Sequence, residues 1–153
     1  MNHIKIRSLP DVVWDANMAF RKTNRPHDIL VAEDDQDMRR LVTEVLTRSG
    51  YNVDAAHDGA AAWEILQLKS YHLLITDFDM PGMSGIELVR KARVSRMTLP
   101  IIMVSGTMPE NEIKQNYSLR ISATLFKPFG VEDLLKTVKE VLGATISASI
   151  LEA

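Results

Sequence analysis

Short apolar runs alternate with polar segments along most of this chain. Four runs are apolar over nearly their whole length, which is typical of strands buried on both faces of a sheet. These four runs are Ile29–Ala32, Leu73–Asp77, Ile101–Val104 and Ala123–Phe126. A fifth segment, Tyr51–Ala56, is also predicted to form a strand.

The segments between these strands have the spacing of helices. Asp35 and Asp58 are predicted to be the N-caps of the first two helices, and Gly50 is predicted to end the first. Ser84 and Glu87 have the spacing of a capping box for the third. The apolar residues at helical spacing are Met38, Leu41, Val42, Val45, Leu46, Ala62, Ile65, Leu66, Ile86 and Val89.

Two further helices are expected toward the C-terminus. The first, near Pro109 to Tyr117, has few apolar residues, and two interpretations stay open for it: a movable element or an ordinary solvated surface helix. The last helix has apolar residues at helical spacing from Val131 to Leu142, and Gly143 is predicted to close it.

Strands and helices therefore alternate five times, which predicts a doubly wound α/β fold: a parallel sheet with helices on both faces. Parallel strands point the same way, so their carboxyl ends share one edge. Ligands bind at that edge in open α/β sheets. The side chains expected to converge there are Glu33, Asp34, Asp77, Ser105 and Lys127.

This set of side chains indicates phosphoryl chemistry. Crowded carboxylates need a cation or a proton, and a few hard oxygen ligands suit Mg²⁺. A hydroxyl and an ammonium would bind the oxygens of a phosphoryl group, which a carboxylate such as Asp77 can accept as an aspartyl phosphate. Taken singly, each residue has a simpler interpretation: Asp77 and Ser105 as turn residues, Glu33 and Asp34 as the start of a helix.

With these residues in view, the chain resembles the receiver domain of bacterial two-component response regulators, of the single-domain, chemotaxis-regulator-like type. The resemblance covers roughly residues 27 to 142. It rests on Glu33-Asp34, Asp77, Met80-Pro81, Gly85, Ser105 and Lys127-Pro128-Phe129.

The resemblance implies a flavodoxin-like sheet with the strand order 2-1-3-4-5. It also implies that Asp77 accepts a phosphoryl group from a histidine kinase or a histidine phosphotransfer protein. Glu33, Asp34 and Asp77, with the backbone carbonyl of Asp79, would bind Mg²⁺. Such a protein catalyses phosphorylation and dephosphorylation of its own aspartate and is otherwise a signalling protein rather than an enzyme.

Roles for the remaining residues follow from the same resemblance. Ser105 would contact the phosphoryl oxygens as a switch residue, and Lys127 would pair with them. Asp79 and Thr107 would flank the pocket and set the phosphoryl lifetime. Thr124 departs from the family pattern, because members usually have an aromatic residue at this position that swings inward on activation.

Length and composition agree with a single receiver domain with two short flanks. The chain has 153 residues, a net charge of −2 and no cysteine. These values predict no nucleic-acid partner and fit a cytoplasmic location, and no apolar stretch is long enough to span a membrane. Residues 1–26 form an N-terminal extension that is either a short amphipathic helix or a frayed leader; the tail 143–153 either extends the last helix or remains loose. A single-domain receiver would act by docking on a downstream protein, and it could form a homodimer.

Two other functions are compatible with parts of the sequence. Asp77-Phe78-Asp79 also resembles the D-x-D signature of haloacid-dehalogenase-type phosphatases, but here the acidic pair Glu33-Asp34 comes first and Pro81 replaces the usual Thr or Val. The second is an interaction module that keeps the receiver fold without being phosphorylated. Turnover of a phosphomonoester would favour the first, and absence of Mg²⁺ binding the second.

Overall fold

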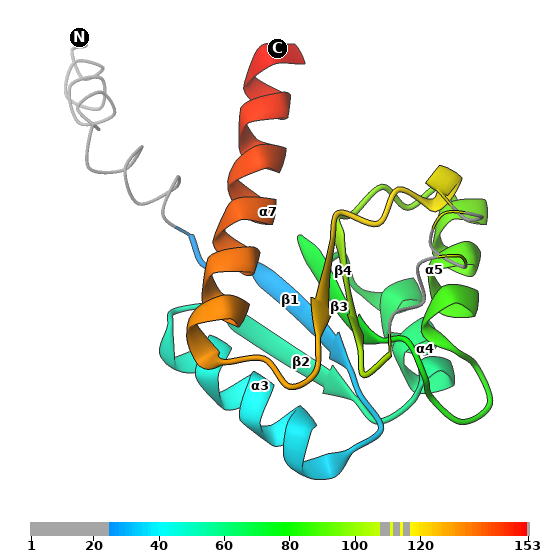
Figure 1. Cartoon of the computed structure of the whole chain (residues 1–153). Coiled ribbons are helices and arrows are strands. Elements are labelled where there is room, and N and C mark those ends of the chain that lie inside the picture. The colour runs from blue at the N-terminus through cyan, green and yellow to red at the C-terminus, as the bar shows by residue number, and fades with distance from the viewer. Residues whose placement is uncertain (1–24, 108–110, 112–113, 115–116, 153) are drawn as a thin grey trace, which may run out of the picture.

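The computed structural model describes residues 25–107, 111, 114 and 117–152. Five parallel strands form one sheet in the order β2-β1-β3-β4-β5 (Figure 1). This is the predicted fold and strand order. The strands are β1 (Asp28–Ala32), β2 (Asn52–Ala56), β3 (Leu73–Asp77), β4 (Ile101–Ser105) and β5 (Ala123–Phe126).

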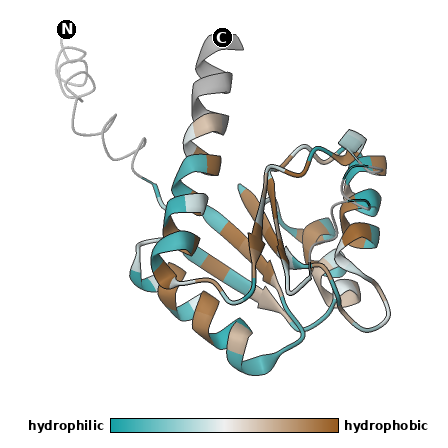
Figure 2. Cartoon of the chain, in the orientation of Figure 1, coloured by the Kyte–Doolittle hydropathy of each residue, from teal (hydrophilic) through white to brown (hydrophobic). Residues whose placement is uncertain are grey.

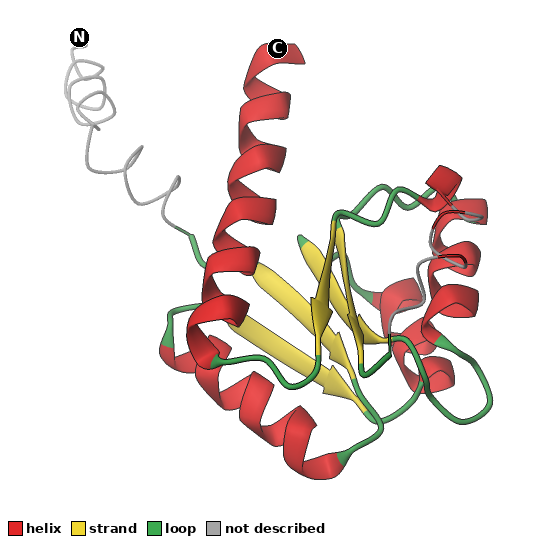
Figure 3. Cartoon of the chain, in the orientation of Figure 1, coloured by secondary structure: helices red, strands yellow, loops and turns green. Residues whose placement is uncertain are grey.

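Helices cover both faces of the sheet (Figure 3). Helices α3 and α7 lie on one face, and α4 and α5 pack side by side on the other (Figure 1). The helices are α3 (Gln36–Arg48), α4 (Gly59–Leu68), α5 (Gly85–Val94) and α7 (Val131–Glu152), with a short 3-10 helix η1 (Tyr117–Leu119) before β5. None of the helices in the described part of the chain is long and apolar enough to cross a membrane.

Alternation along the central strands separates two hydrophobic cores. In β1, Ile29 and Val31 join the core under α3 and α7, whereas Leu30 and Ala32 join the core under α4 and α5. This is the pattern that successive side chains of a strand produce when both faces are covered. Apolar residues accordingly dominate the central strands β3 and β4, whereas the edge strand β2 is largely exposed and the helices carry both apolar and polar residues (Figure 2).

The predicted N-caps are confirmed, and they fix where three helices begin. The carboxylate of Asp35 accepts from Met38 N–H at 2.9 Å, and that of Asp58 accepts from the third residue of its helix at 2.7 Å. Ser84 and Glu87 form the predicted capping box. Each helix therefore starts directly after a loop at the carboxyl edge of the sheet, which is the edge predicted to carry the site.

One predicted helix end is wrong. Helix α7 does not close at Gly143 but continues to Glu152, so that it extends past the sheet (Figure 1). Glycine costs only about 1 kcal/mol in a helix interior, which is too little to stop a helix without a turn signal after it. The predicted N-terminal amphipathic segment lies almost wholly outside the described residues, as does most of the predicted helix near Pro109 to Tyr117.

Candidate functional site

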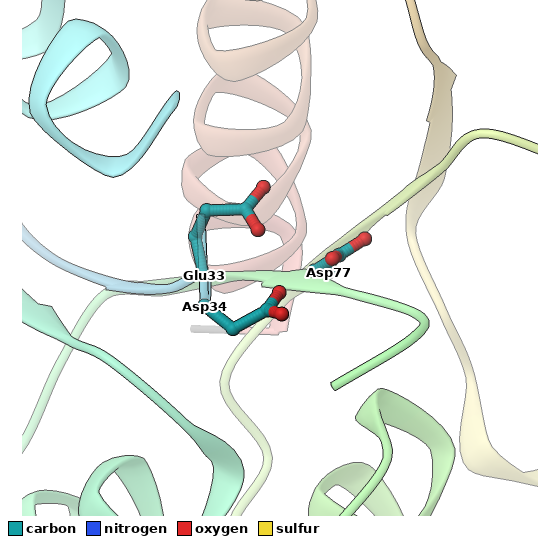
Figure 4. A group of neighbouring side chains, drawn as sticks. All are labelled: Glu33, Asp34 and Asp77. Atoms are coloured by element: carbon teal, nitrogen blue, oxygen red, sulfur yellow. The ribbon is translucent and has the colours of Figure 1, made fainter. Parts of the chain in front are cut away.

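Three carboxylates meet at the carboxyl edge of the sheet. Glu33 and Asp34 follow β1, Asp77 ends β3, and these two strands are neighbours. Each residue offers a carboxylate oxygen within 4.8 Å of the others, and the side chains point into one space (Figure 4). Glu33 and Asp77 are only 4% and 6% exposed, whereas Asp34 is exposed. The predicted acidic cluster is therefore present.

Lys127 brings a positive charge to this cluster from the end of β5. Its Nζ lies 3.0 Å from Oε1 of Glu33 and 3.5 Å from Oδ1 of Asp77. Its backbone N–H donates to the carbonyl of Ser105 at 2.7 Å, which ties the ends of β4 and β5 together. The ammonium thus bridges two carboxylates that repel each other.

The electrostatics follow from burial and from this crowding. Burial raises the pKa of Asp77 to about 7; the charge of Glu33 adds to the rise, and Lys127 opposes it. Burial lowers the pKa of Lys127, but its pairing with Glu33 and Asp77 outweighs burial and leaves that pKa raised. Another cation beside Asp77 would favour its ionised form.

Ser105 is buried at the end of β4, the strand next to Asp77. Its hydroxyl donates to the carbonyl of Thr107 at 2.6 Å and accepts from Thr107 N–H at 3.2 Å. The single proton of this hydroxyl is therefore engaged with the loop after β4, so donating it to another acceptor at the site would exchange the bond to the carbonyl of Thr107.

The structure also describes Asp79 and Thr124, whose predicted roles stay predictions. Asp79 is exposed, in the loop after β3. Thr124 is partly buried in β5, two residues before Phe126, which is 42% exposed. Leu125 between them faces the α3–α7 core, so Thr124 and Phe126 share the opposite face, as alternation predicts.

Two contacts at this site were not anticipated from the sequence. Arg39, one turn into α3, donates to the backbone carbonyl of Glu33 at 2.8 Å and thereby anchors the acidic loop. At the start of α5, a Cβ on Gly85 would lie 2.2 Å from the carbonyl oxygen of Asp77, so only glycine fits there. The only signals of these contacts in the sequence are a basic residue six positions after Glu33 and a glycine at the start of the helix.

Comparison with known families gives a match to the response regulator receiver domain over residues 29–139. Among curated relatives, the response regulator receiver protein CpdR of Brucella abortus is 39% identical over 114 residues, covering 74% of this chain and 95% of that protein. The described chain also resembles solved structures of single receiver domains. The chemotaxis protein CheY4 of Vibrio cholerae superposes with a TM-score of 0.72 at 30% identity, covering 76% of this chain and 98% of that one.

A second solved structure bears on the acidic cluster. The response regulator protein TrrA of Thermotoga maritima, solved in complex with Mg²⁺ and BeF, superposes with a TM-score of 0.67 at 29% identity. The match covers 75% of this chain and 98% of that one. None of these comparisons supports the phosphatase alternative.

Proposed function

This chain belongs to the response regulator receiver family of two-component signalling, and on that premise we propose that Asp77 accepts a phosphoryl group from a phosphohistidine and thereby switches a protein-docking surface. The observation that carries the proposal is the position of Asp77: a buried carboxylate at the end of β3, 3.5 Å from Lys127 and beside Glu33 and Asp34. The phosphoryl donor is a histidine kinase or a histidine phosphotransfer protein.

In this transfer an oxygen of Asp77 forms the new bond to phosphorus while the bond from phosphorus to the donor imidazole nitrogen breaks. The bonding electrons leave with the imidazole, which takes up a proton as it departs. Asp77 has to be ionised to attack, and its pKa near 7 means that the neighbouring positive charge of Lys127 helps to populate the reactive form at neutral pH. Lys127 also stands where it can pair with the arriving phosphoryl oxygens.

The donor set fits Mg²⁺. The three hard oxygen ligands of Glu33, Asp34 and Asp77 converge within 4.8 Å. Two of these carboxylates are buried, and Lys127 is the one ammonium that pairs with them among the described residues. The backbone carbonyl of Asp79 stays a predicted fourth protein ligand. When bound, Mg²⁺ supplies charge neutralisation for the phosphoryl oxygens. Arg39 contributes by fixing the loop that carries Glu33 and Asp34.

Ser105 and Lys127 carry the switch in this proposal. A phosphoryl group brings about −1.5 to −2 charges and three strong acceptors. Ser105 would exchange its bond to Thr107 for a phosphoryl oxygen, which moves the loop after β4 inward. Asp79 and Thr107 flank the pocket and would set how readily water reaches the aspartyl phosphate.

The partners follow from the same proposal. A downstream protein would bind the phosphorylated form selectively, and a second copy of the chain could use the same surface. The proposal includes no nucleic-acid partner. The cytoplasmic location stays a prediction. The division of the chain also stays a prediction: an N-terminal extension (1–26), a receiver domain (27–142) and a C-terminal tail (143–153).

Mass spectrometry of the intact protein tests the proposal. The wild type, Asp77→Asn and Asp133→Asn are incubated with Mg²⁺ and a small phosphodonor such as acetyl phosphate; Asp133 is an exposed acid in the first turn of α7 and serves as the control. The wild type and Asp133→Asn should gain one phosphoryl mass, and Asp77→Asn should gain none. Equal phosphorylation of Asp77→Asn would contradict Asp77 as the acceptor.

The rival function, a module that is never phosphorylated, predicts a different result. A folded wild type would then gain no mass, and beryllofluoride with Mg²⁺ would leave the resonances of Asp77 and Lys127 unchanged. If the chain binds beryllofluoride but acetyl phosphate does not phosphorylate it, the receiver site is intact. Its phosphoryl donor is then restricted to a protein phosphohistidine.

A further inference from the structure

A groove runs between α4 and α5, on the face of the sheet opposite α3 and α7. It has a volume of about 770 Å³. Gly82 and Met83 line its end near the phosphoacceptor loop, and Val94 and Ser95 line the other end. Along its length the residues from the two helices are Ala60, Trp63, Glu87, Arg90 and Lys91.

Apolar side chains of this groove are open to solvent. Val94 is 78% exposed, and Trp63 is only partly buried although it packs against the core. Nζ of Lys91 lies 5.7 Å from the centre of the Trp63 ring, so the indole is held between the core and a cation. An accessible tryptophan beside basic residues is the composition of an interaction hot spot.

The charge along the groove is positive. Among the described residues that line it, Arg90 and Lys91 are basic and Glu87 is acidic, so the lining carries one more basic than acidic residue. Glu87 also accepts from Ser84 N–H at 3.0 Å in the capping box. A partner segment with acidic residues would therefore be complementary to the groove. A segment with excess positive charge would be repelled.

Neither terminal segment of the chain is complementary to this charge. Residues 1–24 contain four basic and two acidic residues, which is the wrong sign for the groove. Residues 143–152 contain one charged residue, Glu152, and so provide little complementarity. Two copies of the chain docked groove to groove would bring like charges together.

We propose that the α4–α5 groove binds an acidic amphipathic helix of a partner protein. The groove follows the ten residues of α5, about 15 Å, and this length matches three turns of a helix. Aliphatic side chains of the partner contact Trp63, Met83 and Val94, and its acidic residues face Lys91. This is the helix-in-groove mode of peptide recognition.

One end of the groove lies at the loop that follows β3, but the groove is a separate surface from β5 and α7. A Cβ on Gly59 would lie 2.5 Å from the backbone oxygen of Met83, so the start of α4 packs tightly on the loop that lines the groove. The inference stands on the groove alone and does not depend on phosphorylation of Asp77.

Two-dimensional NMR of the full chain tests it. The probes are two synthetic helical peptides with the same leucine stripe, one with glutamate at all other positions and one with lysine. The reporter is the indole N–H of Trp63, assigned by comparison with Trp63→Phe. Lys91→Glu reverses a charge in the groove, and Arg40→Glu makes the same change on exposed α3 as the matched control.

The glutamate peptide should shift the Trp63 signal and the amides of Met83 and Val94, and the lysine peptide should not. Lys91→Glu should weaken binding of the glutamate peptide about fivefold, and Arg40→Glu should leave it unchanged. Equal binding of both peptides, no binding of the glutamate peptide, or shifts outside the groove would overturn the proposal. A Trp63 shift caused by a peptide of residues 1–24, or by raising the concentration of the chain alone, would also overturn it by assigning another occupant.

Discussion

Lys127 forms its shortest ion pair with Glu33, at 3.0 Å, across the carboxyl edge of the sheet. Its distance to Asp77, the proposed phosphoacceptor, is longer, 3.5 Å. The same ammonium therefore balances a buried predicted metal ligand and the residue that we propose attacks phosphorus. A change in the charge of Glu33 or of Asp77 therefore affects the other carboxylate through Lys127. The first two predictions follow from this coupling.

Replacing Lys127 with alanine should slow phosphorylation of Asp77 at neutral pH by at least about tenfold. The substitution removes the charge of Lys127, which lowers the pKa of Asp77, and the proposed partner of the phosphoryl oxygens. Initial rates with acetyl phosphate, measured by intact mass, check this. Lys136→Ala, on the exposed side of α7, should keep the wild-type rate. An unchanged rate in Lys127→Ala would remove Lys127 from the mechanism.

The stability of the metal-free protein should fall with rising pH because of Asp77. Its pKa is about 7 in the folded protein, raised from about 4 in an unfolded chain. Between these values the folded state holds the extra proton, so the free energy of unfolding decreases from about pH 4 to about pH 7. Urea titrations across this range should show a smaller decrease for Asp77→Asn, which is then the more stable protein at pH 8. Parallel curves for the two proteins would contradict the raised pKa.

Gly85→Ala should destabilise the fold by about 2 kcal/mol and impair phosphorylation. The new Cβ would lie 2.2 Å from the carbonyl oxygen of Asp77, so α5 or the end of β3 has to move. The matched control is Gly143→Ala in α7, where nothing lies within 4 Å of the added Cβ. Alanine should raise the free energy of unfolding there by roughly 0.5 to 1 kcal/mol. Thermal and urea unfolding of both variants would separate these opposite effects.

The sequence predicts the fold and the convergence of the site because both depend on strong local patterns. A run such as Leu73–Ile75 can be satisfied only in the centre of a covered sheet, and the acids and hydroxyls that follow such runs meet at one edge. The N-caps Asp35, Asp58 and Ser84 are equally local, since each bonds to an amide three residues ahead.

What the sequence does not reveal depends on contacts between distant residues. The preference of Lys127 for Glu33 over Asp77 is a matter of side-chain geometry across three strands. The continuation of α7 past Gly143 depends on the balance between one glycine and the helix around it. The close approach of Gly85 to Asp77 likewise has no periodic signature.

Arg93 is a further example, and it yields a stability prediction. Its guanidinium donates to the backbone carbonyls of Leu119, Arg120, Met97 and Leu99, which joins the end of α5 to the segment before β5. Arg93→Met keeps the aliphatic length but leaves these carbonyls without their donor, at a cost of about 2 kcal/mol in urea unfolding.

The control for this measurement is Arg40→Met on exposed α3, which should change the free energy of unfolding by less than about 0.5 kcal/mol. Equal stability of the two variants would mean that water replaces the guanidinium without loss.

Ser105→Ala should separate phosphoryl binding from its structural consequence. The hydroxyl of Ser105 bonds only to Thr107 among the described residues, so its removal leaves the carboxylates and Lys127 in position. Asp77 should therefore still gain a phosphoryl mass and still bind beryllofluoride. Without the hydroxyl, however, no group draws the loop after β4 toward the bound anion.

The amide resonances of β5, which pairs with β4 from Ala123 to Phe126, report this movement. Beryllofluoride should shift them in the wild type and in Ser49→Ala, which removes a hydroxyl that donates to the backbone carbonyl of Val45 in α3. In Ser105→Ala the shifts should shrink markedly although beryllofluoride binds. Full wild-type shifts in that variant would mean that β5 responds to the bound anion through Lys127 alone. The switch would then need neither the hydroxyl of Ser105 nor an aromatic residue at Thr124, and the signals of the half-exposed Phe126 would still change.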